Sequence, residues 1–121
     1  MTVQTARGAC LCGGVSYEVR GPLRGVIACH CSQCRRTSGH FVAATSAANA
    51  DLLLTSSATL VWYASSEGVE RGFCSRCGGN LFWRRTGGPD SERTSIMAGT
   101  LDPPTGLQVI QHIFTEDKSD Y

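Results

Sequence analysis

The stretch Cys74-Ser-Arg-Cys-Gly-Gly79 places two cysteines three positions apart and ends in two glycines. A tight turn of this kind brings two sulfurs to one metal ion, and Gly78 can adopt the positive φ that closes the turn. This pattern is typical of a zinc knuckle, which supplies half of a tetrahedral site. The other two ligands must come from elsewhere in the chain, and that requirement constrains the fold.

A second cysteine pair, Cys10 and Cys12, lies far upstream of the knuckle. On an extended backbone residues i and i+2 project from the same face, so both sulfurs can bind one ion. The two pairs together predict a closed four-thiolate zinc site with the ligands Cys10, Cys12, Cys74 and Cys77. A closed zinc site of this kind stabilises small zinc peptides by roughly 10 to 16 kcal/mol, so we expect it to be structural.

The remaining cysteines, Cys29, Cys31 and Cys34, are close enough in the chain to form a second site without distant ligands. Three protein ligands leave one coordination position for water or substrate, which is typical of catalytic zinc. Three thiolates and one Zn²⁺ carry a net charge of about minus one, which suits a soft thiol as the fourth ligand. We therefore predict two zinc ions, one structural and one catalytic, with Cys29, Cys31 and Cys34 at the catalytic one.

The cysteine spacing leaves three alternatives open. A histidine can close the second site as its fourth ligand; the chain has His30, His40 and His112. Of these, His30 is the least favourable, because in an extended Cys-His-Cys its ring points away from both sulfurs. The cysteines at 29 and 31 can instead join the knuckle, or the second group can consist of free thiols.

Composition limits the class of protein. The 121 residues are enough for one compact domain, and we expect a single domain over residues 1–121. The balance of 11 basic against 10 acidic residues predicts neither a nucleic-acid nor an anionic-membrane partner. An odd count of seven cysteines excludes a complete disulfide framework, and no apolar stretch has the length of a signal peptide core or membrane span. We expect a cytoplasmic protein; the sequence makes no prediction of oligomeric state.

Short β-type runs separated by glycines predict a mostly β protein with little helix. We expect a helical turn over Cys31–Thr37, and we expect Ala43–Leu54 to be strand and then loop. Core positions are expected for the aromatic residues Phe41, Phe82, Trp83 and Phe114, and for one of Trp62 and Tyr63. The predicted strands are Val15–Val19, Val26–Cys31, His40–Thr45, Thr59–Ala64, Leu81–Arg85, Arg93–Ala98 and Leu107–Thr115.

Five ordered motifs carry a family resemblance. They are Gly8-Ala-Cys-Leu-Cys-Gly-Gly14, Cys29-His-Cys-Ser-Gln-Cys-Arg35, Arg71-Gly-Phe-Cys-Ser-Arg-Cys-Gly78, Gly99-Thr-Leu-Asp102 and His112-Ile-Phe114. With them the chain resembles the family of glutathione-dependent formaldehyde-activating enzymes and centromere protein V. The resemblance implies a β-tent fold of several small twisted antiparallel sheets, a structural zinc at the four-cysteine group and a catalytic zinc at the three-cysteine group.

The resemblance also implies carbon-sulfur lyase activity on a small thiol adduct, with glutathione and formaldehyde as the best-known substrates. Arg35 or Arg36 can orient a substrate carboxylate, although each arginine near the cysteines, Arg71 included, is first expected to be solvated or to compensate thiolate charge. His30 or His112 can relay the proton, although the sequence does not determine the proton-transfer residue. Two alternatives differ in class: a non-catalytic zinc module that binds a protein partner, and a thiol-based metal or redox sensor.

Overall fold

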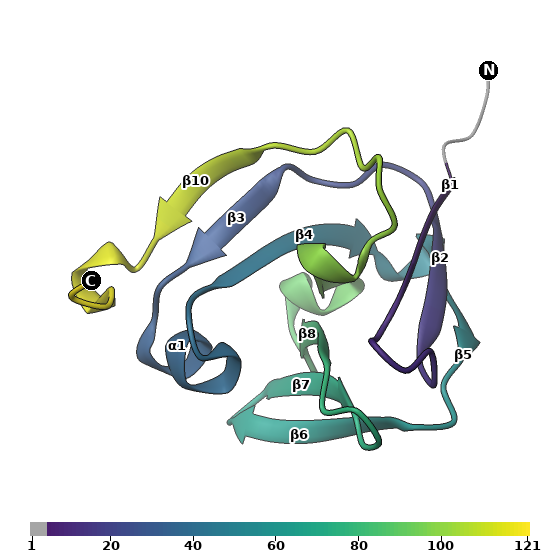
Figure 1. Cartoon of the computed structure of the whole chain (residues 1–121), viewed down its shortest axis with the longest axis horizontal. Helices are drawn as coiled ribbons and strands as arrows, with labels where there is room; N and C mark the ends of the chain where they lie inside the picture. The colour runs from purple at the N-terminus through teal and green to yellow at the C-terminus, as the bar shows by residue number, and fades with distance from the viewer. Residues whose placement is uncertain (1–4) are drawn as a thin grey trace.

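The computed structural model of the chain describes residues 5–121, and these form two β-sheets with one short α-helix (Figure 1). The smaller sheet has the order β1-β2-β5, with β1 at Thr5–Ala9, β2 at Ser16–Arg20 and β5 at Leu52–Ser56. The larger sheet has the order β10-β3-β4-β9-β8-β7-β6. Its strands are β3 at Val26–Cys29, β4 at Val42–Ala48, β6 at Leu60–Ser66, β7 at Val69–Cys74, β8 at Asn80–Arg85, β9 at Arg93–Met97 and β10 at Val109–Ile113. The prediction of a mostly β protein is confirmed.

One strand pairing departs from the antiparallel expectation: β10 runs parallel to β3. Parallel neighbours require a crossover connection instead of a hairpin. The segment between β9 and β10 completes this crossover. It passes through a 3₁₀ turn at Ala98–Thr100 and a Pro-containing loop, and β10 then begins at the edge of the sheet beside β3. The other described strand pairs are antiparallel.

Three strands differ from the sequence-based expectation. The segment that becomes β5 was expected to be loop, but it pairs with β2 and is a strand. Neither β1 nor β7 was predicted, since Thr5–Ala9 and Val69–Cys74 contain Gly, Ala or Arg where β-branched residues are usual. Each of the three is extended because a neighbouring strand offers it hydrogen bonds, which local sequence does not report.

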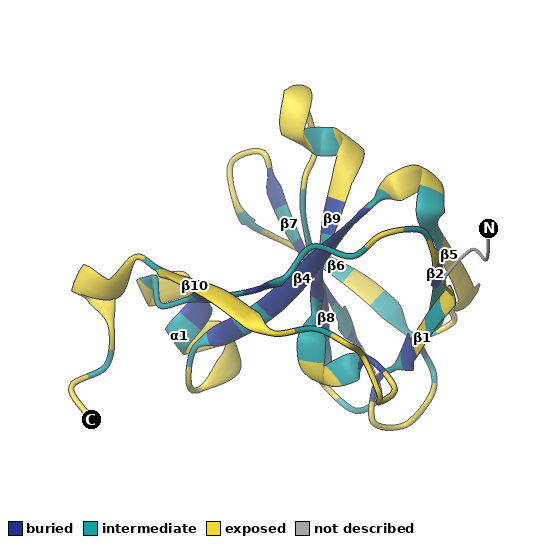
Figure 2. Ribbon diagram, turned by 90° about the horizontal axis from the view of Figure 1, so that it is seen from above, coloured by how far each residue is buried: buried dark blue, intermediate teal, exposed yellow. Residues whose placement is uncertain are grey.

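The core lies between the two sheets. Tyr17 and Phe82, which are 1% exposed each, meet edge to face with ring centroids 5.5 Å apart. In β2 the buried residues alternate with partly exposed ones, which confirms the expected half-buried strand. Figure 2 shows β4 as the most continuously buried strand, at the centre of the molecule, and β10 as largely exposed. Trp62 packs against this core whereas Tyr63 is 63% exposed, so one member of that pair faces inward, as predicted.

The helix α1, Ser32–Ser38, confirms the predicted helical turn. Cys31 is its N-cap, and its sulfur accepts a hydrogen bond from the Cys34 N–H. Gly39 ends the helix in the left-handed conformation that glycine adopts without strain. Among the residues described, no helix has the length and apolar character needed to cross a membrane.

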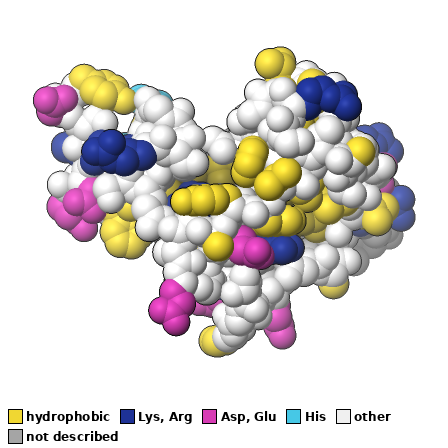
Figure 3. Space-filling model, turned by 90° about the horizontal axis from the view of Figure 1, so that it is seen from below, with side chains coloured by type: hydrophobic (Ala, Val, Ile, Leu, Met, Phe, Trp, Pro, Cys, Tyr) yellow, Lys and Arg dark blue, Asp and Glu magenta, His cyan; other side chains and the backbone are white. Residues whose placement is uncertain are grey.

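Exposed apolar side chains are concentrated on strands at the sheet edges. Figure 3 views the molecule from below, and hydrophobic side chains gather around the middle of that face. The lowest strand in Figure 1, β6, carries the exposed Val61 and Tyr63, while β5 carries Leu53 and Leu54.

Candidate metal centres

The four-cysteine group forms where two turns meet. Cys10 and Cys12 lie in the turn between β1 and β2, Cys74 is the last residue of β7, and Cys77 lies in the turn that follows it. The Sγ atoms of Cys10 and Cys12 are 3.8 Å apart, and those of Cys12 and Cys74 are 3.6 Å apart. Zinc–sulfur bonds of about 2.3 Å in a tetrahedron place sulfurs about 3.8 Å apart, so these residues fit a four-thiolate zinc. Disulfide sulfurs would be about 2 Å apart, and all seven cysteines are free.

Hydrogen bonds hold the knuckle in this shape. The N–H of Gly78 donates to the Cys74 carbonyl at 2.8 Å, and Gly78 has the positive φ predicted from the sequence. The Thr59 hydroxyl, 3.1 Å from the Cys74 sulfur, and the N–H groups of Cys77 and Arg76 lower the pKa of Cys74 to about 5. Cys74 is therefore already a thiolate at neutral pH, which is the form that binds zinc.

The three-cysteine group forms where β3 ends and α1 begins. Cys29 is the last residue of β3, Cys31 caps the helix and Cys34 lies in its first turn. The three sulfurs lie within 4.8 Å of one another, and in residues 5–121 no histidine, carboxylate or knuckle cysteine joins them. The structure therefore separates the cysteines into groups of four and three, and it excludes the alternative in which Cys29 and Cys31 join the knuckle.

The three thiols differ in how readily they ionise. Burial, followed by the neighbouring sulfurs of Cys31 and Cys29, raises the pKa of Cys34 to about 12. Burial also opposes ionisation of Cys31, but hydrogen bonds from the backbone N–H groups of Cys34 and Gln33 outweigh it and lower the pKa of Cys31. Burial therefore opposes ionisation at Cys34, whereas backbone N–H groups favour it at Cys31.

A cavity of about 410 Å³ opens beside the three-cysteine group. Its walls are largely apolar and include Trp83, Met97 and Phe114. The expectation that Trp83 and Phe114 are core residues is wrong: both line this cavity, and Phe114 is 53% exposed because it follows the edge strand β10. Three arginines also line the cavity, and none of its lining residues is acidic.

The arginines of the cavity are Arg24, Arg71 and Arg85. Arg24 donates from Nε to the Gly25 carbonyl at 3.1 Å and from Nη2 to the Ala44 carbonyl at 2.9 Å. Burial, and then the nearby Arg93, lower the pKa of Arg24, since both oppose its positive charge. Arg85 lies 3.8 Å from the Asp90 carboxylate. No sequence motif indicates Arg24 or Arg85, because neither belongs to a cysteine motif: Arg24 precedes Cys29 by five residues and Arg85 follows Cys77 by eight.

The two arginines that follow Cys34 do not line the cavity. Arg36 is exposed, and Arg35 is half-buried with its Nε unpaired. Both lie on α1, and only the side of that helix that carries Gln33 and Cys34 borders the cavity. The expectation that Arg35 or Arg36 orients a carboxylate in this cavity is therefore wrong.

The histidines form a separate cluster. His30 Nε2 and His112 Nδ1 are 2.9 Å apart, His40 Nδ1 is 2.8 Å from the Tyr121 hydroxyl, and Phe41 packs between the rings. None of these groups lines the cysteine cavity. Neither His30 nor His112 therefore lies where it could relay a proton to the three-cysteine cavity, contrary to the sequence-based expectation.

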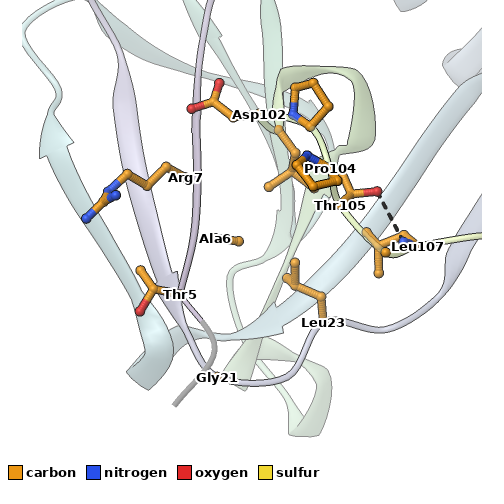
Figure 4. Close-up of a pocket in the computed structure, with 12 residues that line it drawn as sticks. Thr5, Ala6, Arg7, Gly21, Leu23, Asp102, Pro104, Thr105 and Leu107 are labelled. Atoms are coloured by element: carbon orange, nitrogen blue, oxygen red, sulfur yellow. Dashed lines mark hydrogen bonds between the residues drawn. The ribbon is translucent and has the colours of Figure 1, made fainter. Parts of the chain in front are cut away.

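A second cavity, of about 570 Å³, lies elsewhere, between β1 and the loop at 101–107 (Figure 4). No cysteine or histidine lines it. The one arginine there, Arg7, points away from the opening in Figure 4 and pairs with Glu18 at 3.1 Å. We therefore place the chemistry in the smaller cavity, which contains the sulfur ligands.

Comparison with known proteins identifies the family of the chain. A family model described as glutathione-dependent formaldehyde-activating enzyme matches residues 5–117. The chain belongs to this family. The chain is also similar to the crystal structure of a Rhodobacter sphaeroides protein, with a TM-score of 0.69 and 27% sequence identity. The match covers 88% of this family member and 98% of the Rhodobacter sphaeroides chain. A search of curated proteins finds no significant match.

Proposed function

We propose that this protein is a zinc-dependent carbon-sulfur lyase that acts on a small anionic thiol adduct, of the type formed by glutathione and formaldehyde. One observation carries the proposal: a three-thiolate group, without a fourth protein ligand in the described residues, opens into a cavity with three arginines and no carboxylate. The four-cysteine group would hold a structural zinc, and Cys29, Cys31 and Cys34 would hold the catalytic one. A reducing compartment such as the cytoplasm would keep all seven thiols available.

The residues of the chain would bind and orient the adduct. A zinc ion bound by Cys29, Cys31 and Cys34 supplies a Lewis acid that lowers the pKa of a substrate thiol. Arg24 retains an N–H group that neither backbone carbonyl uses, and it can donate to a substrate carboxylate. The apolar wall formed by Trp83 and Met97 would exclude water from the adduct.

In the lyase direction the carbon-sulfur bond of a hemithioacetal breaks. Its hydroxyl loses a proton as the aldehyde carbonyl forms, and sulfur leaves with the electron pair as thiolate. The addition reverses each of these changes. Holding the thiolate beside the aldehyde makes the reaction effectively intramolecular. Since the described histidines lie outside the cavity, the proton would pass to solvent at the cavity mouth.

Two-dimensional exchange NMR of formaldehyde with glutathione tests this activity directly. We expect the zinc-loaded protein to accelerate exchange between free aldehyde and hemithioacetal, and we expect C31S to lose the effect. 2-Mercaptoethanol, a small thiol with neither an amine nor a carboxylate, is the control and should gain less, because it offers the arginines no anionic group. The absence of acceleration for every anionic thiol tested would exclude the lyase.

The non-catalytic alternative rests on exposed apolar residues of two strands: Val61 and Tyr63 of β6, and Leu53 and Leu54 of β5. Apolar patches of this kind are typical of protein-binding surfaces. That function needs no cavity at the three-cysteine group and predicts that polar substitutions in β6 weaken partner binding. Polar substitutions there should leave thiol-aldehyde exchange unchanged, so the two functions are separable in one set of variants.

A further inference from the structure

Arg71 is the one buried charged side chain in the described part of the chain, with 8% of its surface exposed. It lies in β7, and no carboxylate forms an ion pair with it there. Its Nε donates to the Ser65 hydroxyl at 3.2 Å and its Nη2 to the Gln33 side-chain oxygen at 3.4 Å. Both terminal nitrogens also point to one sulfur, that of Cys34, at 3.9 and 3.8 Å.

These contacts give each nitrogen of the Arg71 guanidinium a hydrogen-bond partner, but only one of the partners can carry a negative charge. A guanidinium stays protonated in proteins, and a buried charge without a counter-charge is destabilising by several kcal/mol. The Ser65 hydroxyl and the Gln33 amide are neutral. The sulfur of Cys34 is therefore the one contact that can carry a negative charge, as it does when it binds a metal ion as a thiolate.

The charges balance when the three-cysteine group holds a divalent metal. Three thiolates and one divalent ion carry a net charge of about minus one, and the guanidinium brings the total to about zero. A negatively charged fourth ligand then brings the total to about minus one instead of minus two. Loss of Arg71 should therefore penalise an anionic ligand more than a neutral one.

We propose that Arg71 is a positioning residue that acts through Cys34 as the counter-cation of the three-thiolate site. Its two N–H groups hold the Cys34 sulfur and reduce the electron density that the sulfur donates, so that the site favours an anionic fourth ligand. This inference rests on metal binding at Cys29, Cys31 and Cys34, as in the proposed function, but it does not require lyase activity.

Cobalt is the probe of choice, because Co²⁺ replaces zinc and its thiolate bands are visible by absorption spectroscopy. The protein with Co²⁺ at both groups would be titrated with 2-mercaptoethanesulfonate, an anionic thiol, and separately with imidazole, a neutral ligand. We expect R71Q to shift the thiolate-to-cobalt charge-transfer band and to weaken binding of the thiol about tenfold or more, as removal of contacts to metal ligands usually does. Imidazole binding should change less than threefold.

Two further variants give the comparison. R71K keeps the positive charge but cannot fork to one sulfur, so we expect thiol affinity within about threefold of wild type together with a shifted band. R84Q is the matched control: Arg84 lies on the adjacent strand β8, pairs with Glu70 at 3.0 Å and does not line the cavity, so R84Q should match wild type in both measurements.

Three outcomes would overturn the inference. R71Q could match the wild-type band and affinities, or it could weaken thiol and imidazole equally, which would indicate a purely structural role. If R71Q does not fold, the R71K spectrum is the test. A thiolate-to-cobalt charge-transfer band in R71K that is the same as in wild type would contradict the contact of both Arg71 terminal nitrogens with the Cys34 sulfur. Failure of the wild-type three-cysteine group to bind Co²⁺ is a separate result, which would contradict the proposed function itself.

Discussion

Tyr17 combines the largest fully buried side chain in the described core with a single polar partner. Its hydroxyl lies 2.7 Å from Thr100 Oγ1, and Thr100 in turn donates to the Met97 carbonyl. The Thr100 proton is thus committed, so Tyr17 must be the donor. Burial is the main cause that raises the pKa of Tyr17 to about 12, and the nearby Asp102 adds to it.

This pKa predicts a loss of stability at high pH. Below pH 10 Tyr17 is neutral in both the folded and the unfolded chain, so its stabilising effect is complete. Above pH 10 the unfolded chain ionises first, and the free energy of unfolding falls by about 1.4 kcal/mol at pH 11. Urea unfolding of wild type and Y17F at pH 8 and pH 11 measures this.

At pH 8 Y17F should be less stable by about 1 kcal/mol, because it loses one hydrogen bond. At pH 11 the difference should vanish or reverse. A difference that is the same at both pH values would contradict the raised pKa. Absorbance at 295 nm gives an independent check, since Y17F should lack only the part of the tyrosinate signal that appears at the highest pH.

Arg24 is a single side chain that is expected to bind the carboxylate of the substrate. We expect R24M to raise KM for a glutathione adduct about tenfold or more, since a charge-assisted hydrogen bond contributes roughly 1.5 to 3 kcal/mol. With an esterified glutathione the change should be smaller. R36M is the control, since Arg36 is exposed and lies outside the cavity. Equal effects of R24M on acid and ester would exclude a contact with the carboxylate.

At the scale of elements, β1 connects the small sheet to the segment that follows β9. Gly8 pairs with Tyr17 across β1 and β2 and forms an isolated bridge with Leu101. A Cβ at Gly8 would lie 2.5 Å from the Thr100 carbonyl oxygen and would overlap the Tyr17 hydroxyl. The close approach of three segments therefore requires glycine at this position.

G8A should accordingly destabilise the protein by roughly 1 to 3 kcal/mol, the usual effect of overpacking. Gly87 is the control: it has no positive φ, and a Cβ there would meet no heavy atom within 4 Å, so G87A should stay within about 0.5 kcal/mol of wild type. Thermal denaturation followed by circular dichroism compares the two. Equal stability of G8A and G87A would show that β1 moves away from Thr100 without cost.

At the scale of the whole molecule, the four-cysteine group joins the β1–β2 turn of the small sheet to the β7–β8 turn of the large one. The three-cysteine group joins only β3 to the helix that directly follows it. A metal ion at the first group closes a long chain segment, and one at the second closes a short one. The two ions should therefore contribute unequally to global stability.

C12S and C29S test this inequality. We expect two zinc ions per chain in wild type and one in each variant, measured by inductively coupled plasma mass spectrometry. C12S should lower the melting temperature strongly, whereas C29S should lower it by only a few degrees. A larger loss in C29S would reverse the assignment of the structural site. A single unfolding transition of the zinc-loaded protein would also test the prediction that residues 1–121 form one domain.

The sequence by itself predicted the division of the cysteines into groups of four and three, with another pairing left open for the structure to exclude, and it determined the mostly β character of the chain. Ligand spacing and strand alternation are local: Cys-x-x-Cys-Gly forms its turn, and Val15–Val19 shows its period of two, without reference to distant residues. These predictions survive because they depend on neighbours in the chain.

Only the tertiary structure decided which strands pair and which side chains reach the cavity. The strands β1, β5 and β7 are extended because neighbouring strands form hydrogen bonds with them. The strand β10 lies parallel to β3 because a crossover connection brings it to that edge of the sheet. Arg24 and Arg85 enter the site from outside the cysteine motifs, and Arg71 of β7 contacts Cys34 of α1. Such contacts join residues distant in the chain, so their energies depend on the packing of the whole molecule and not on any local pattern.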